Sequence, residues 1–296
     1  MSELLCFLGL PPLLAIYNSG DWSRLATFSG IMAVLYAVVP VVLVSEAVVL
    51  IWRRPRSYAW AAICYAINRT VALTVGLSIL AWLIGTLQPY QPFTVAGPVG
   101  FLYAYLVWEL AHYAYHRSCH RCRLLWCLHS VHHAPEDMHL MVGHARHVLE
   151  GPYADLVRTS ICLMLGVPVP MLLAIMAIDG LWGWAIHVSP DLMPRARVPF
   201  LLGPSEHRVH HARNPEYIDR NYCNLLPVWD RLLGTYAPER ARPDYGITRR
   251  PQTFASMYLG EVGYLIRDVR AAGGIAAKLW VVLGPPLGKR GGYTCR

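Results

Sequence analysis

The chain has 296 residues, of which 55% are hydrophobic and only 15% are charged. A soluble domain carries roughly 25% charged residues, so this composition excludes two ordinary soluble domains, a disordered chain and a disulfide-built secreted module. The mean hydropathy of +0.35 instead indicates an all-α integral membrane protein.

The formal net charge is +8, and all of the 26 basic residues except Lys278 and Lys289 are arginines. Such a charge could indicate nucleic-acid binding. The arginines gather beside apolar runs, however, where they would contact anionic lipid headgroups. We therefore expect these arginines to contact a membrane and not a nucleic acid. The eight cysteines follow no regular spacing and are interpreted as reduced thiols.

The apolar runs predict about three to four transmembrane helices and a short helical hairpin. Residues 4–17 are apolar but too short to cross a bilayer, so we expect an interfacial or re-entrant segment. Three later runs come close to the length of a full crossing: residues 31–52, 70–87 and 93–115. Residues 156–187 are also apolar, but Gly and Pro interrupt them at 166–170, which predicts a tilted or partly inserted hairpin.

Basic residues orient these spans. Arg53, Arg54 and Arg56 follow the first long span and place its end in the cytosol. Two further crossings return the chain to the same side near Arg117 and Arg121. If the hairpin enters and leaves on one side, the histidine-rich segments all lie on the cytosolic face.

All 13 histidines lie between His112 and His211. They form the patterns His-x3-His-x3-His at 112–120, His-x2-His-His at 129–133 and His-x2-His-His at 207–211, with His187 alone between them. On a helix, residues four apart share one face, whereas neighbours point about 100° apart. His132 and His133, or His210 and His211, could thus bind two different ions, and imidazole suits Fe, Zn and Cu.

A single His-x3-His pair is common on solvated helix faces, but two His-x2-His-His sets confined to one window predict a centre with two metal ions. We expect nine histidines to act as metal ligands and catalytic residues: His116, His120, His129, His132, His133, His187, His207, His210 and His211. His112 could ligate, orient another ligand or pack between helices. His139 and His144 fit interfacial polar positions.

A ligating imidazole usually donates its second N–H to a carboxylate or a carbonyl, which orients the ring. Seven polar residues near the histidines are candidates for this role, with an exposed charge or a helix cap as the alternative for each: Glu109, Glu136, Asp137, Glu150, Asp219, Asn221 and Asp230. The Cys119-x2-Cys122 pair suggests a zinc knuckle, but its only neighbouring cysteine is Cys127, and we disfavour it.

These motifs resemble the fatty acid hydroxylase / sterol desaturase superfamily of membrane-bound di-iron enzymes. The likeness runs from about Glu109 to Tyr236. His116-Arg117-x2-His120, His129-x2-His132-His133 and His207-x2-His210-His211 match the three histidine boxes, and His187 matches a lone extra ligand. The segments 136–138, 219–222 and 229–236 match the flanking motifs. Residues 147–150 resemble a His-Pro-x-Glu element, and this resemblance makes His147 a further candidate for orienting a ligand. The sequence departs from that element at Val148, which stands in place of the proline.

The resemblance implies two iron ions, O2 as co-substrate and hydroxylation of a C–H bond in an acyl, alkyl or sterol-like lipid. It also implies a separate electron-transfer protein, or a tetrahydropterin if the similar alkylglycerol monooxygenase branch is the right one. A desaturase with the same ligands is the enzyme alternative. A metal transporter is the alternative from another class, and it would need ligands along a crossing path.

The predicted organisation has three parts. Residues 1–100 form an N-terminal membrane region, residues 101–240 the fatty acid hydroxylase-like di-iron region, and residues 241–296 a C-terminal tail that could associate with the membrane. We expect an integral membrane protein with its active site on the cytosolic face.

Overall fold

The computed structural model describes residues 10–194, 197–198 and 200–286. Every regular element assigned within these ranges is a helix. The prediction of an all-α protein is confirmed for this part of the chain. Part of the predicted interfacial segment, residues 4–9, lies outside the described residues, as does the end of the predicted tail, residues 287–296. The chain divides into two compact units, residues 1–55 and 56–296.

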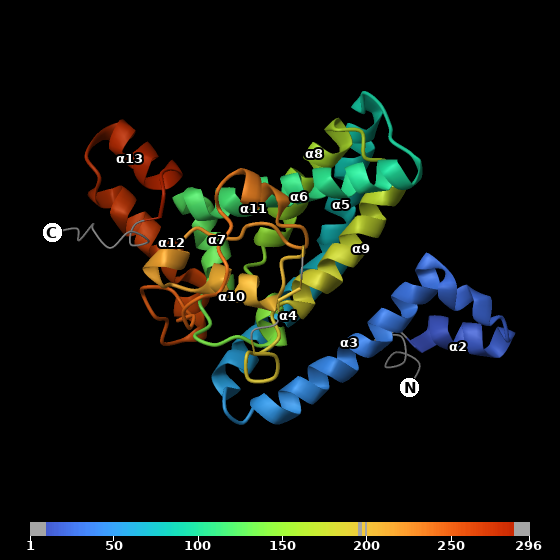
Figure 1. Cartoon of the computed structure of the whole chain (residues 1–296). Helices are drawn as coiled ribbons and strands as arrows, with labels where there is room; N and C mark the ends of the chain where they lie inside the picture. Colours follow the sequence, from blue (N-terminus) through green and yellow to red (C-terminus); the bar gives the residue numbers. More distant parts are fainter. Residues whose placement is uncertain (1–9, 195–196, 199, 287–296) are drawn as a thin grey trace. The chain divides into compact units, whose positions relative to one another are not determined.

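The first unit contains three helical segments: α2 (Leu10–Ser19), η1 (Trp22–Ala26) and α3 (Phe28–Leu50) (Figure 1). Thr27 begins α3 as its N-cap, because its side-chain oxygen accepts a hydrogen bond from the amide of Gly30 at 3.2 Å. The 23 residues of α3 extend over about 35 Å, which exceeds the ~30 Å hydrocarbon thickness of a bilayer. This helix is one of two in the described chain that are long and apolar enough to cross a membrane.

The second candidate span is a continuous helical segment from Pro55 to Tyr90. It consists of four elements: α4 (Pro55–Val71), the π-helical η2 (Ala72–Gly76), α5 (Leu77–Leu87) and η3 (Gln88–Tyr90). The sequence predicted a helix only from residue 70. The helix begins earlier because Pro55 fits the first turn and no glycine or further proline interrupts residues 56–71.

The histidine-bearing unit is built around α6 (Gly97–Arg121), which packs against the hairpin of α8 (Glu150–Met164) and α9 (Val169–Ala185) (Figure 1). The break in this hairpin agrees with the sequence prediction. Gly166 has φ +80°, and the ring of Phe93 occupies the space in which a Cβ atom would lie. A side chain at residue 166 is therefore excluded by both backbone conformation and space.

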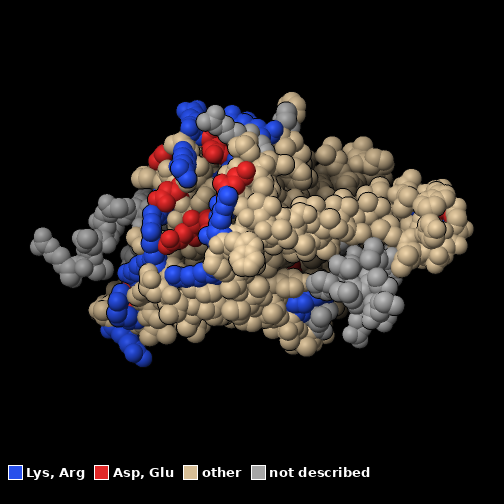
Figure 2. Space-filling view, turned by 90° about the horizontal axis from the view of Figure 1, so that it is seen from below, with Lys and Arg blue, Asp and Glu red and all other residues tan. Residues whose placement is uncertain are grey.

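The predicted third span coincides largely with α6, which is helical but is not apolar enough to count as a candidate span. Polar residues from Glu109 onward lower its apolar content, and much of the helix is buried inside the unit. The predicted three to four spans and their orientation remain predictions. In the view of Figure 2, the charged side chains gather over one region of the face, and the rest of that face shows almost none.

The remaining elements are short helices that surround the histidines, followed by two helices at the end of the described chain: α7 (Arg123–His133), η4 (Leu140–His144), α10 (Pro204–His211), η5 (Pro215–Tyr217), α11 (Val228–Leu232), α12 (Phe254–Ala271) and α13 (Gly274–Leu283). The last two helices pack against α7. Residues 254–283 are thus attached to a helix that carries three histidines.

Arg123 links α7 to α12. Its side chain is 1% exposed, and its guanidinium lies 3.4 Å from the carboxylate of Glu261 and 3.5 Å from that of Asp268. The backbone amide of Arg123 also donates to the carbonyl of Gly284 at 2.8 Å. The start of α7 is therefore held by both ionic and backbone contacts.

We expect Arg123→Ala to destabilise the protein by about 3 kcal/mol, because it leaves two partly buried carboxylates without their cation. Arg267→Ala is the matched control, since Arg267 also pairs with Asp268 but is 63% exposed, and exposed pairs contribute little. Thermal unfolding of the detergent-solubilised protein measures both. Equal unfolding midpoints for the two variants would contradict this assignment.

Candidate metal centre

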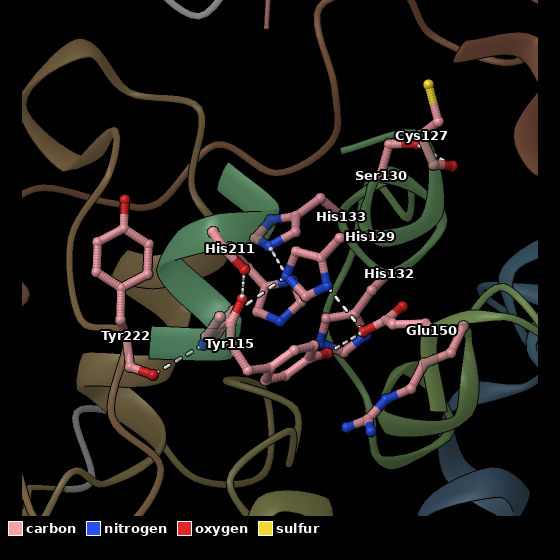
Figure 3. Close-up of polar contacts among 12 residues, drawn as sticks. Tyr115, Cys127, His129, Ser130, His132, His133, Glu150, His211 and Tyr222 are labelled. Carbon is pink, nitrogen blue, oxygen red and sulfur yellow. Dashed lines mark hydrogen bonds and ion pairs between the residues drawn. The ribbon is translucent and has the colours of Figure 1, made fainter. Parts of the chain in front are cut away.

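Nine buried imidazoles meet in the interior of the second unit. His116 and His120 come from α6, and His187 follows the end of α9. The other six come from the two His-x2-His-His sets on α7 and α10: His129, His132, His133, His207, His210 and His211. Figure 3 shows the rings of His129 and His133 turned toward each other, with Glu150 beside His129.

The nine rings form two groups, in each of which the possible ligand atoms lie within 4.8 Å of one another. The five-histidine group contains His116, His120, His129, His133 and His210. The four-histidine group contains His132, His187, His207 and His211. Sequence neighbours at 132–133 and at 210–211 belong to different groups, because adjacent side chains on a helix diverge.

Acceptors outside the groups fix the tautomer of several rings. The Nδ1 atom of His116 lies 2.8 Å from the carbonyl of Tyr222, and that of His129 lies 2.8 Å from the Glu150 carboxylate. The same ring atom lies 2.6 Å from the Gly183 carbonyl in His187 and 2.8 Å from the Arg220 carbonyl in His210. Carbonyl and carboxylate oxygens only accept, so each Nδ1 carries the proton and each Nε2 carries a lone pair.

These lone pairs point at one another. The Nε2 atoms of His116 and His129 lie 3.0 Å apart, although neither carries a proton to share. Two nitrogens bound to one ion at about 2.1 Å would lie about 3.0–3.4 Å apart. The donor set therefore fits a cation between the rings, and imidazole ligands suit iron, zinc and copper.

Burial favours the neutral form of at least five of these rings. Burial, and then repulsion from neighbouring rings, lowers the pKa of His116, His133 and His211 well below 6.5. The pKa values of His132 and His207 are lowered for the same reasons. The lone pairs are accordingly available at neutral pH without prior loss of a proton.

Glu150, at the start of α8, orients His129. Its carboxylate accepts from His129 and, at 2.6 Å, from the hydroxyl of Tyr115 (Figure 3). Burial raises the pKa of this carboxyl, but the His129 ring and the hydrogen bonds outweigh burial and hold the pKa below its ordinary value. On the five-histidine group, Asp219 lies 3.7 Å from His120.

The loop at residues 219–226 presents two of the carbonyls that orient ligand rings. Asp219 and Asn221 adopt positive φ angles of 60° and 57°, which aspartate and asparagine tolerate better than most residues. The Asn221 amide donates to the carbonyls of Glu206 and Ala237 at 2.8 and 2.7 Å. This places the loop against α10.

Two buried carboxylates hold the rest of this loop. Asp230 accepts from the amides of Tyr222 and Cys223 at 2.8 and 2.7 Å. Glu109 accepts from three successive amides, those of residues 224–226, at 2.8 to 3.1 Å. Glu109, Asn221 and Asp230 thus bond to the loop and not to the histidine rings. They position the Tyr222 carbonyl, which in turn orients His116.

The two remaining acidic candidates, Glu136 and Asp137, contact residues outside the two histidine groups. Glu136 is exposed and pairs with Arg250 at 3.4 Å, and Asp137 lies 3.6 Å from His139. His139 stacks on Tyr58 of α4.

Two of the remaining histidines also contact aromatic rings outside the two groups. His144 contacts Tyr65, and His147 stacks on Tyr258. His112 lies against the ring of His116 and 3.7 Å from Asp179. In the described chain, neither group includes any of four histidines: His112, His139, His144 and His147.

Two glycines were not singled out from the sequence, although both position His187. The carbonyl of Gly183 accepts a hydrogen bond from Nδ1 of His187. A Cβ atom at Gly143 would lie 3.2 Å from that Nδ1 atom. A side chain at 183 would also meet the amide of Asn224 at 3.0 Å. Spacing of histidines carries no signal for such close approaches.

Comparison with known proteins agrees with the sequence motifs. The fatty acid hydroxylase family model matches residues 101–235. Alkylglycerol monooxygenase of Danio rerio is 33% identical over 183 residues, which cover 60% of this chain and 40% of the relative. Ornithine lipid hydroxylase of Rhizobium tropici is 27% identical over 60% of this chain and 59% of its own length. Lathosterol oxidase of Homo sapiens is 25% identical over 42% and 40%.

The predicted resemblance is confirmed over this region. The chain spans less than two thirds of the length of each of these relatives. No solved structure matches it.

We expect Glu150→Gln to lower metal affinity about 10- to 100-fold, because a neutral amide holds the His129 proton less strongly than a carboxylate. Glu136→Gln is the matched control, since its side chain is exposed and pairs with Arg250. Metal retention during competition with a chelator measures the effect. Indistinguishable retention in both variants would contradict a role for Glu150 in orienting His129.

Gly143→Ala should remove metal from the four-histidine group alone. The added methyl would crowd the His187 ring and shift it by a few tenths of an ångström relative to the other three donors of its group, and this lengthens its 2.6 Å hydrogen bond to Gly183. We expect the metal content to fall by about half. Gly151→Ala, where a Cβ atom would meet nothing within 4 Å, is the control. Equal metal content in the two variants would show that the close approach is unimportant.

Proposed function

We propose that this chain is a membrane-bound di-iron oxygenase that uses O2 to hydroxylate a C–H bond of a lipid. The proposal starts from the match of residues 101–235 to the fatty acid hydroxylase family. The observation that carries this proposal is the pair of buried histidine groups with their lone pairs turned inward. The relatives are named as a monooxygenase, a hydroxylase and an oxidase, which supports an oxidoreductase.

In this proposal each histidine group holds one iron, and the nine histidines are the ligands. Iron in these positions would supply the activation of O2 and the abstraction of hydrogen from an unactivated C–H bond. The protein contributes a preorganised donor set: outer acceptors such as Glu150 and the Tyr222 carbonyl hold each Nδ1 proton away from the ions. Burial of the rings excludes water, which favours a reactive oxidant.

A lipid substrate is supported by the names of the relatives, which refer to an alkylglycerol, an ornithine lipid and lathosterol. The two candidate spans support entry of this lipid from a bilayer. The arginines near the histidine region favour the cytosolic side for the active site. Electrons would come from a separate protein, or from a tetrahydropterin if the reaction is that of an alkylglycerol monooxygenase.

The same donor set would serve a desaturase, and the reaction product distinguishes the two. We expect mass spectrometry of lipids from cells that express the chain to show a product that has gained one oxygen atom. A product that has instead lost two hydrogen atoms would assign desaturation and contradict hydroxylation.

The ligand assignment is tested by His132→Ala. This change removes one of the four donors of its group, so we expect the purified protein to hold about one iron in place of about two and to lose turnover. His144→Ala is the control, because His144 lies in the same histidine window but packs on Tyr65. Full hydroxylation by a metal-free preparation would overturn the proposed function.

A further inference from the structure

The last helix of the described chain turns apolar side chains outward. Ile275, Leu279 and Leu283 are spaced four residues apart on α13, so they share one face of the helix. They are 79%, 54% and 61% exposed, and Trp280, next to this face, is 71% exposed. A surface helix of a water-soluble protein normally turns its polar side outward. We refer to these four residues as the α13 apolar face, which fits an apolar environment.

The neighbouring helix α12 also exposes apolar side chains. Leu259 and Ile266 lie about two turns apart on one face of α12 and are 55% and 46% exposed, whereas Met257 and Leu265 are buried. The helices α12 and α13 pack against each other and against α7 (Figure 1). The apolar exposure is therefore a property of the helix pair and is not confined to one helix.

Contacts at its end fix the orientation of α13. The Gly284 carbonyl accepts from the amide of Arg123 at 2.8 Å, and the Cys122 thiol lies 3.7 Å from the Val282 carbonyl. Val281 and Val282 are half-buried, and Val281 lies on the side of the helix opposite the α13 apolar face. The helix is thus attached to the protein elsewhere, and its apolar face remains on the outside.

The charges of the helix pair are sorted between its inner and outer sides. Glu261 and Asp268 are the only acidic residues between 254 and 283, and both face the buried Arg123, at 3.4 and 3.5 Å. The basic side chains of the same segment are all exposed: Arg267, Arg270 and Lys278. Arg267 also lies 3.4 Å from Asp268 but is 63% exposed. The outer surface of the segment is therefore apolar and positively charged.

This combination fits the headgroup region of an anionic bilayer. Interfacial helices bury Trp and Leu side chains at the boundary between headgroups and acyl chains, while basic side chains contact the lipid phosphates. Lys278 lies off the α13 apolar face, where its ammonium group can reach those phosphates. The ten residues of α13 extend over about 15 Å, which is too short to cross the hydrocarbon core. The helix therefore fits a position parallel to the bilayer surface.

A second copy of the chain fits this surface less well than a bilayer does. In a symmetric dimer the same patch lies on both partners, so α13 would face α13. Each copy would bring its Lys278 and Arg270 near the same positive charges of the other copy. The two acidic residues of the segment are held by Arg123 and supply no counter-charge on the outside. Anionic lipids would supply that counter-charge.

We propose that α13 lies in the headgroup region of an anionic bilayer, with its apolar face toward the acyl chains and with Lys278 and Arg270 on the lipid phosphates. Because Arg123 joins α12 and the end of α13 to α7, this contact seats the three histidines of α7 near the membrane surface. The inference goes beyond the proposed function and does not depend on it, since α12 and α13 contain no histidine.

Photo-cross-linking of the whole, metal-loaded chain in lipid nanodiscs tests this inference. The nanodiscs contain phosphatidylcholine and phosphatidylglycerol in equal amounts. Ile275 is replaced by p-benzoylphenylalanine, which on illumination bonds covalently to a neighbouring C–H group, and the mass of the product identifies what was captured. Ala277 is the matched control position, because it is also exposed but lies on the side of α13 opposite Ile275.

We expect phospholipid adducts at Ile275 and far fewer at Ala277. Phosphatidylglycerol should be captured about fivefold more often than phosphatidylcholine, which is the preference that one basic residue near an anionic surface provides. Lys278→Gln should remove most of this preference. Arg242→Gln, which removes an exposed arginine outside α12 and α13, should leave it unchanged.

A product with twice the mass of the chain would show that α13 binds a second copy and would overturn the inference, as would the lack of any lipid adduct at Ile275. Equal capture at Ile275 and Ala277 would contradict an orientation parallel to the surface. Equal capture of the two lipids at Ile275 would contradict selection of anionic headgroups. Metal content of the two photoreactive variants verifies that they fold. Each outcome leaves the proposed function as it stands, because the readout is the mass of an adduct and not turnover.

Discussion

The burial of nine imidazoles around two small volumes is the constraint on which the structure depends. Rings whose lone pairs face each other, such as those of His116 and His129, repel unless a cation lies between them. Their outer nitrogens must therefore be held from outside. Glu150, the carbonyls at 183, 220 and 222 and the left-handed residues at 219 and 221 all serve that requirement.

The fold connects these outer supports to the long helices. Glu109 and Asp230 bind the five successive backbone amides of residues 222–226, so each of these amides is hydrogen-bonded although the segment has no regular structure. Because Glu109 is on the same helix as His116, the loop and the ring that it orients are both anchored to α6. The α8–α9 hairpin adds Glu150 at one end and His187 at the other, which joins both histidine groups to one apolar core.

The same arrangement explains which sequence predictions could not be sharpened. Glu136 and Glu150 looked equivalent as acidic neighbours of the histidines, yet one pairs with Arg250 at the surface and the other bonds to His129. His139 and His144 fall in the histidine window but pack on tyrosines of α4, more than 70 positions earlier in the chain. Contacts between segments so distant in sequence leave no local pattern.

The sequence by itself determined the all-helical class, the break in the hairpin at Gly166 and the helical spacing of eight of the nine histidines, because period and backbone restriction are local properties. Even the division of His132 and His133 between two groups follows from the angle between neighbours on a helix. Only the tertiary structure decided which polar groups face the rings. Gly143 approaches His187, and Asp179 faces His112, through packing between separate helices, which residue spacing does not encode.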